Sequence, residues 1–481
     1  MAQTLKAKTL KGLSWSFIGQ LGNQVIRVGL TALLARLLSP EEFGVIAMIT
    51  VFSGFGNVIL NFGFAPAIIQ HQSLSQSSLS SIFWLNTVMA MCLSGALMLC
   101  SPLIANFYDL DILQPLTVFM ATTFLFSGLN VVQNALLSKE LKFDVLVKQT
   151  LIATAISGAI ACGLAYSGFG VWSLATQLVA SPLLITVLVW NKSDWRPSWV
   201  FRAKDIKGVS KISGSLFLNS SLSYVANNVD NMIIGRMFGQ TSLGLYSKSF
   251  AIISIPPNLL SRVLSAVMLP SFSKLQDQPE KIGRVYLDMT KIIAMTATPI
   301  MVLIALYTET FISVVFGDGW MGAKPYIQIF CVSGVIASIN TLLGSVIISR
   351  GRSDLVVKEA LIKRPVILIG ILAGAWWGPL GIAFGKLSAD VINLCVTFFQ
   401  VRTALGLTLV QQIVIIAKPI LYITISMVLA FTTFEYFRGN VSKYSTAVSI
   451  LLTLATYAFS VFVFDRATVA MLYRLMRPVR S

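Results

Sequence analysis

The residues best able to do chemistry in this sequence are polar side chains embedded in long apolar stretches. In the stretch 215–246 they recur at three- and four-residue spacing, on one face of a helix: Asn219, Ser223, Asn227, Asp230 and Asn231. A carboxylate in the middle of such a helix costs about 3 kcal/mol in lipid. We therefore expect this face to contact protein or water.

A second stretch, 13–35, carries a similar polar face that includes Gln24 and Arg27. Arg27 lies near the middle, about 15 Å from either end at about 1.5 Å per residue, so its side chain cannot reach the membrane surface. The residues on its own face are uncharged and cannot neutralise it. We predict that Arg27 lines a cavity, and Asp230 is one hypothesised partner.

Further charged and amide side chains lie in other apolar stretches. Lys386 and Asp390 are one helical turn apart and can neutralise each other, whereas Lys248 can extend towards a membrane interface. The predicted substrate-binding residues are Arg27, Gln24, Asn57, Asn227, Lys248 and Lys386. Asp230 and Asp390 are the candidates for coupling transport to a Na⁺ or H⁺ gradient, because a carboxylate at membrane depth can hold a cation or a proton.

Covalent chemistry has few candidate residues in this chain. His71 is the single histidine, and the five cysteines lie in apolar stretches without metal-ligand spacing. The sequence GDGWMG at 317–322 matches a dinucleotide-binding glycine pattern, but no strand precedes it. We expect no catalytic residue, no metal site and no cofactor.

The composition identifies an integral membrane protein. Hydrophobic residues make up 56% of the 481 residues and charged residues 11%, whereas soluble domains carry about 25% charged residues. We predict an all-α polytopic fold with about fourteen transmembrane helices. The expected spans are 13–35, 43–63, 81–104, 113–136, 149–167, 170–190, 212–235, 243–268, 289–314, 325–348, 361–377, 380–401, 411–433 and 445–464.

The distribution of basic residues predicts the orientation. If the N-terminus is cytoplasmic and the spans alternate, most of the 36 Lys and Arg residues fall on the cytoplasmic side. Both termini are then cytoplasmic. The net charge of +17 is explained by this bias and by attraction to anionic lipid headgroups, so we do not expect nucleic-acid binding.

The sequence also contains an internal repeat. The segment 33–47 aligns with 233–247, and ANFYD at 105–109 aligns with VFGD at 315–318. Matched positions include Lys11 and Lys211, Phe17 and Phe217, Arg36 and Arg236, and Gly44 and Gly244. Two copies in the same order, each with an even number of spans, predict parallel repeats of the kind found in transporters.

The repeat defines three predicted domains. Residues 1–207 and 208–404 are each expected to form a six-helix bundle, and 405–481 to form two appended transmembrane helices and a basic tail.

Several motifs in combination resemble a known family, over about residues 5 to 400. They are LLARLLSPEEFG, SIFWLN, LLSKELKF, PPNLLSRVLSAVMLPSFSKLQDQPEKIGRVY and VFGDGWMGAKP. Together they resemble the polysaccharide exporters of the MOP (multidrug/oligosaccharidyl-lipid/polysaccharide) flippase superfamily, and most of all the Wzx-type, colanic-acid-exporter-like branch. The family has no short motif that transfers position by position, so the predicted site residues rest on charge placement.

The resemblance implies two bundles around a cavity that opens alternately to each side of the bacterial inner membrane. It implies a flippase that moves an undecaprenyl-pyrophosphate-linked oligosaccharide for exopolysaccharide, O-antigen or capsule synthesis. Membrane lipids are expected partners, and a polysaccharide polymerase or chain-length machinery is a candidate partner. The alternatives are a lipid II flippase, a cation-coupled drug antiporter of the same superfamily, and a membrane glycosyltransferase or polymerase.

Overall fold

The fold is helical throughout the described part of the chain, which contains no strand. This computed structural model describes residues 2–60, 68–70, 74–202, 207–259, 261, 268, 272, 278–349, 353–437 and 445–466. His71 and parts of several expected spans lie outside these residues. The all-α prediction is confirmed.

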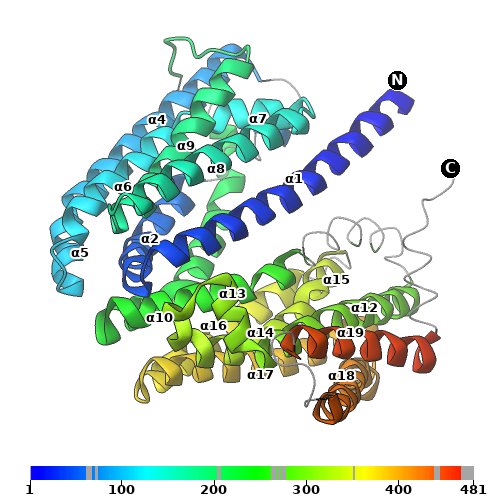
Figure 1. Ribbon diagram of the computed structural model, residues 1–481. Helices are drawn as coiled ribbons and strands as arrows, with labels where there is room; N and C mark the ends of the chain where they lie inside the picture. Colours follow the sequence, from blue (N-terminus) through cyan, green and yellow to red (C-terminus); the bar gives the residue numbers. More distant parts are fainter. Residues whose placement is uncertain are drawn as a thin grey trace. The chain divides into compact units, whose positions relative to one another are not determined.

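The helices follow one another closely along the chain (Figure 1). In the first half they are α1 (Ala2–Leu37), α2 (Pro40–Leu60), α4 (Gln76–Leu99), α5 (Ser101–Tyr108), α6 (Leu113–Gly128), α7 (Val131–Lys139), α8 (Phe143–Tyr166) and α9 (Val171–Lys192). In the second half they are α10 (Lys207–Ile253), α12 (Pro279–Leu306), α13 (Thr308–Val315), η2 (Asp318–Ala323), α14 (Lys324–Ile339), η3 (Asn340–Leu342), α15 (Leu343–Ser349), α16 (Ser353–Ala375), α17 (Gly378–Leu405), α18 (Leu409–Phe437) and α19 (Ser445–Phe464).

Within the described residues, nine helices are long and apolar enough to cross a membrane, and Val448–Phe464 is a shorter apolar helix. The protein is therefore a multi-pass membrane protein. The predicted spans 13–35, 212–235 and 361–377 fall in α1, α10 and α16, which are not among the nine. The predicted span 243–268 is not among the nine either: it begins in α10, and part of it lies outside the described residues. Polar and charged side chains lower the hydropathy of these helices, and the number of fourteen spans stays a prediction.

The chain divides into two compact units. The N-unit comprises Met1–Ser247 and Val315–Gly319, and the C-unit comprises Lys248–Val314 and Trp320–Ser481. The N-unit therefore includes most of α10, which the repeat assigns to the second predicted domain. The boundaries predicted from the repeat stay a prediction.

Polar side chains join the helices of the N-unit by bonding to neighbouring backbones. Asn86 on α4 donates to the carbonyl of Gly128 on α6 at 3.0 Å, and Ser94 donates to the carbonyl of Ala121 at 2.9 Å. On α9, the Trp190 indole donates to the backbone carbonyl that follows α6, at 2.9 Å. Such bonds satisfy polar groups that would be costly to leave unpaired in an apolar interior.

In the C-unit, glycines bring α16 and α17 into close contact. A β-carbon at Gly370 would collide with the carbonyl of Gly385, and one at Gly374 with the carbonyl of Gly381. Small residues at such positions let membrane helices approach closely. The C-terminal pair packs elsewhere, since the Tyr457 hydroxyl of α19 donates to the backbone carbonyl of Met295 on α12 at 2.8 Å.

The helix α10 is interrupted at Gly239, whose φ of 81° and ψ of 177° suit glycine rather than residues with a side chain. This break lies in the connection 236–242 that we expected between two spans.

Beside the break, α2 and α10 cross with almost no space between their backbones. A β-carbon at Gly44 would collide with the carbonyl oxygen of Gln240, and one at Gly244 would collide with the carbonyl oxygen of Pro40. We call this contact the glycine crossing. Its two halves are related by the sequence repeat, because position 44 matches 244 and position 40 matches 240.

Candidate functional site

In the N-unit, Arg27 is exposed on α1, and Gln24, one turn earlier, is half-buried. Within the described part of the chain, Arg27 has no ionic or hydrogen-bonding partner. It lies ten residues before Leu37, the last residue of α1, or about 15 Å along the helix. The structure thus presents a guanidinium whose hydrogen-bond donors are available to an anion or water.

The environment of Asp230 differs from that of Arg27, although the repeat places the two residues in equivalent helices. Its side chain is 1% exposed. Its carboxylate accepts a bond from the Tyr246 hydroxyl at 2.8 Å and another from the Asn231 backbone N–H at 2.9 Å. No ion pair joins it to Arg27 among the described residues. The bond to Tyr246 links the two segments of α10 on either side of Gly239.

The two predicted asparagines of the N-unit are less enclosed. Asn57 on α2 is half-buried, and its side-chain amide donates to the carbonyl of Ser53 at 3.1 Å. Asn227 is exposed on α10. Of these two amides, only that of Asn227 is fully accessible to an oligosaccharide hydroxyl.

In the C-unit, the structure brings Lys386 and Asp390 together within α17. Lys386 is 8% exposed, and its ammonium lies 3.9 Å from the centroid of the Phe250 ring, which is a cation–π contact. Asp390 is half-buried one turn later, and the charges of Lys386 and Lys363 both act on it. Lys248, the other predicted cation of this unit, is half-buried.

This polar cluster extends beyond the residues predicted from the sequence. Lys363 on α16 donates to the Thr397 hydroxyl on α17 at 3.0 Å. The α17 residues recur at helical spacing on one face: Lys386, Asp390, Asn393, Thr397 and Gln400. Extending the Lys386–Asp390 spacing along span 380–401 would have identified this face, whereas nothing in the sequence linked Lys363 to it.

Two acceptors within the cluster have no donor in the described part of the chain. They are the side-chain carbonyl oxygens of Asn393 and Gln400, both buried. Buried acceptors of this kind normally bind a donor, so they are suited to water or a cation. The C-unit therefore combines two lysines, one carboxylate and neutral acceptors in one partly buried region.

Ion pairs also lie near helix ends in both units. In the N-unit, Arg236 on α10 pairs with Asp109, the residue after α5, and both are solvent-exposed. In the C-unit, Lys324 pairs with Glu309 and holds the pKa of that carboxyl below its usual value. Exposed pairs of this kind contribute little to stability, and their solvent-exposed side chains are accessible to other charged groups.

Comparison with known proteins identifies the family. Residues 33–325, more than half of the chain, match the family described as "Polysaccharide biosynthesis protein". The chain belongs to this family. The predicted resemblance to polysaccharide exporters is confirmed at this level.

Two relatives of this polysaccharide biosynthesis protein are similar over most of their length. One is the "Uncharacterized membrane protein in cps region" of Klebsiella pneumoniae, 26% identical over 98% of this chain and 99% of that protein. Another is the "Lipopolysaccharide biosynthesis protein WzxC" of Escherichia coli strain K12, 25% identical over 86% of this chain and 85% of that one.

Among solved structures, the lipid II flippase MurJ in its inward closed conformation has the same fold as this family member. The TM-score is 0.77, with 15% sequence identity, over 95% of this chain and 100% of MurJ. The two chains therefore share the arrangement of their helices.

Proposed function

We propose that this protein is a flippase that moves an undecaprenyl-pyrophosphate-linked oligosaccharide across the bacterial inner membrane. The observation that carries the proposal is Arg27, an exposed guanidinium deep along α1 without a partner in the described part of the chain. Guanidinium groups bind phosphates through two parallel hydrogen bonds, which a compact ammonium cannot do. Family membership and the name of the WzxC relative support a polysaccharide precursor as cargo.

The charges also favour an anionic cargo over the drug-antiporter alternative. A pyrophosphate carries about two negative charges and cannot cross hydrocarbon without replacement of its water shell. The predicted site has three cations, Arg27, Lys248 and Lys386, against the carboxylates Asp230 and Asp390. Asp230 is buried against Tyr246, which leaves Asp390 as the more accessible carboxylate.

Transport of this kind needs no covalent step. The cations replace water around the phosphates, and exposed amides such as Asn227 bond to sugar hydroxyls. The polyprenyl chain stays in the bilayer. Translocation then requires only that the binding groups face each side of the membrane in turn, so no catalytic residue, metal or cofactor is needed.

The proposal is tested by deleting the gene and extracting lipid-linked oligosaccharides. We expect undecaprenyl-pyrophosphate-linked repeat units to accumulate on the cytoplasmic side and surface polysaccharide to be lost, with both effects reversed by the intact gene. Accumulation of lipid II would favour the lipid II flippase alternative. Turnover of a sugar donor by the purified protein would favour the glycosyltransferase alternative.

We also propose that both termini are cytoplasmic. Reporter fusions after Lys207 and Gln278 are then expected to report cytoplasm, and fusions after Asp111 and Gln240 to report the outside. Inversion of either set would overturn the orientation.

Asp390 is our proposed coupling residue. It is a half-buried carboxylate beside two lysines, so exchange of a proton or cation there changes the charge of the cluster. Asp390→Asn keeps the shape of the side chain and removes its charge. We expect this variant to reach the membrane and to lose the dependence of transport on a proton or sodium gradient.

Asp230→Asn is the matched comparison, because it makes the same change in the N-unit. Asp230 accepts two hydrogen bonds inside its unit, so its substitution is expected to lower stability while the gradient dependence persists. Transport by the two variants is measured in vesicles with imposed gradients. Gradient dependence retained by Asp390→Asn and lost by Asp230→Asn would move the coupling role to Asp230, and dependence retained by both would exclude either residue.

A further inference from the structure

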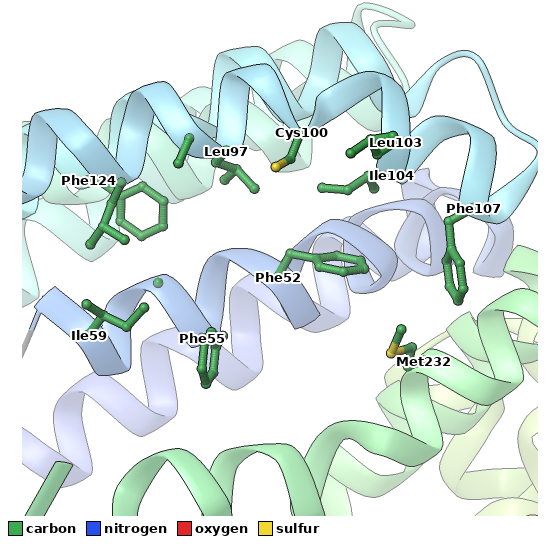
Figure 2. A pocket seen from close by; sticks show the side chains of 13 residues that line it. Phe52, Phe55, Ile59, Leu97, Cys100, Leu103, Ile104, Phe107, Phe124 and Met232 are labelled. Carbon is green, nitrogen blue, oxygen red and sulfur yellow. The ribbon is translucent and has the colours of Figure 1, made fainter. Parts of the chain in front are cut away.

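The N-unit contains an apolar pocket of about 450 Å³ that none of the predicted site residues line. Its walls come from α2, α4, α5, α6 and α10 (Figure 2). Figure 2 shows Ile59 and Phe124 towards one end and Phe107 and Met232 towards the other. The pocket falls within the range of about 300–1,000 Å³ that small-molecule sites occupy.

The pocket is long as well as apolar. On α4 and α5 the lining residues extend from Leu93 to Phe107, which is about 20 Å at 1.5 Å per residue. Figure 2 labels four phenylalanines, two leucines and two isoleucines around the pocket, together with Cys100 and Met232. A flexible hydrocarbon chain fits such a lining better than a compact polar molecule does.

One end of the pocket carries a positive charge. Arg236 follows Met232 by one turn of α10, and its guanidinium lies 5.8 Å from the centroid of the Phe107 ring. Arg236 also pairs with Asp109, and their side chains are 44% and 74% exposed. Because an exposed pair is weak and a guanidinium has five donors, a phosphate at this end can compete for Arg236.

We propose that this pocket binds a polyprenyl phosphate, with the chain against the phenylalanines and the phosphate on Arg236. The proposal rests on the proposed function, since it assigns a place for the carrier lipid of that cargo. Charge complementarity supports it: an apolar chain meets apolar walls, and an anionic head meets the guanidinium. A single elongated groove accepts one chain, whereas a phospholipid has two.

The expected topology places this site on the outer side of the membrane. Asp109 and Arg236 both lie at short connections that are predicted to be outside. The lipid bound here is then the carrier in the outer leaflet, after its oligosaccharide and one phosphate have been removed. This site is separate from the predicted cavity residues, because Arg27 and Gln24 do not contribute to its lining.

Binding is measured on the purified full-length protein by native mass spectrometry, with undecaprenyl phosphate as the probe and a two-chain phosphatidic acid as the comparison. Ala96 lines the pocket and is exposed on α4, so Ala96→Phe fills the groove without disturbing a packed interior. We expect this variant to bind undecaprenyl phosphate about tenfold more weakly. Ala155→Phe, at an exposed position on α8 away from the pocket, is expected to bind normally.

The phosphate contact is tested by substituting each partner of the ion pair. Arg236→Gln is expected to weaken binding, and Asp109→Asn to strengthen it or leave it unchanged, because the guanidinium is then free. Asn tolerates the left-handed backbone at this position, where φ is 55°. Equal weakening by both variants would mean that the pair is only structural, and would overturn the phosphate contact.

Two other results would overturn the proposed binding of the polyprenyl chain in this pocket. One is an equal effect of Ala96→Phe and Ala155→Phe on binding, and the other is binding of phosphatidic acid as tight as that of undecaprenyl phosphate. Because the assay involves no transport, it separates the two proposals. If the protein binds undecaprenyl phosphate at this pocket but does not move the oligosaccharide, the lipid site is supported and the proposed function is wrong. If it moves the oligosaccharide but does not bind undecaprenyl phosphate at this pocket, the proposed function is supported and the lipid site is wrong.

Discussion

Arg27→Ala is expected to abolish polysaccharide export while the protein still reaches the membrane. Arg27 is exposed on α1 and has no partner in the described part of the chain, so its removal leaves no opposite charge stranded within the fold. The interaction that is lost is the one between Arg27 and the anionic cargo. Loss of a charged, hydrogen-bonded contact costs about 2–5 kcal/mol, which corresponds to a decrease in transport of about 30-fold or more.

The measurement is surface polysaccharide per amount of membrane protein on immunoblots. Arg27→Lys is expected to retain part of the activity, because a point charge replaces a planar group that binds phosphate with two bonds. Gln24→Ala is expected to have a smaller effect. Asp230→Ala is not expected to rescue Arg27→Ala, because Asp230 bonds to Tyr246 and not to Arg27. Full export by Arg27→Ala would remove Arg27 from the cargo site.

Gly44→Ala and Gly244→Ala are each expected to destabilise the protein. At both positions the new methyl group would meet a backbone carbonyl, of Gln240 or of Pro40, which cannot rotate away as a side chain can. Overpacking of this kind costs about 1–3 kcal/mol. The cost appears as a lower melting temperature of the purified protein and a lower yield in the membrane.

Gly163→Ala is the matched control on α8. No atom lies within 4 Å of the position its β-carbon would occupy, and alanine is favoured over glycine inside a helix by about 1 kcal/mol. We therefore expect a small increase in stability from the same chemical change. If Gly44→Ala proved as stable as Gly163→Ala, α2 and α10 would not approach each other as closely as described.

Much of the fold follows from patterns that sequence reasoning can detect. Apolar length and low charge predicted a polytopic helical protein, and the match between 33–47 and 233–247 predicted two related halves. The spacing of Lys386 and Asp390 predicted one helical turn between them, and both lie on α17. These are local properties of helices, which depend on a period of 3.6 residues.

Contacts between helices were less predictable because they depend on packing. The pattern 215–246 placed Asp230 on a polar face, but its partner Tyr246 lies beyond the break at Gly239. Lys363 joins the C-unit cluster from a different helix. The predicted span 81–104 is divided between α4 and α5, where Pro102 lacks the N–H that would continue the hydrogen-bond ladder.

The reciprocity of the glycine crossing has a consequence for the origin of the chain. Gly44 in the first copy contacts residue 240 in the second, and Gly244 in the second copy contacts residue 40 in the first. The same two positions of the repeat therefore contact each other twice, once in each direction. This is the signature of an isologous contact, which arises at the twofold axis of a homodimer. A single ancestral repeat would therefore have associated with an identical partner through this same surface, both inserted in the same direction. Fusion of the two genes would have preserved that dimer interface inside one polypeptide.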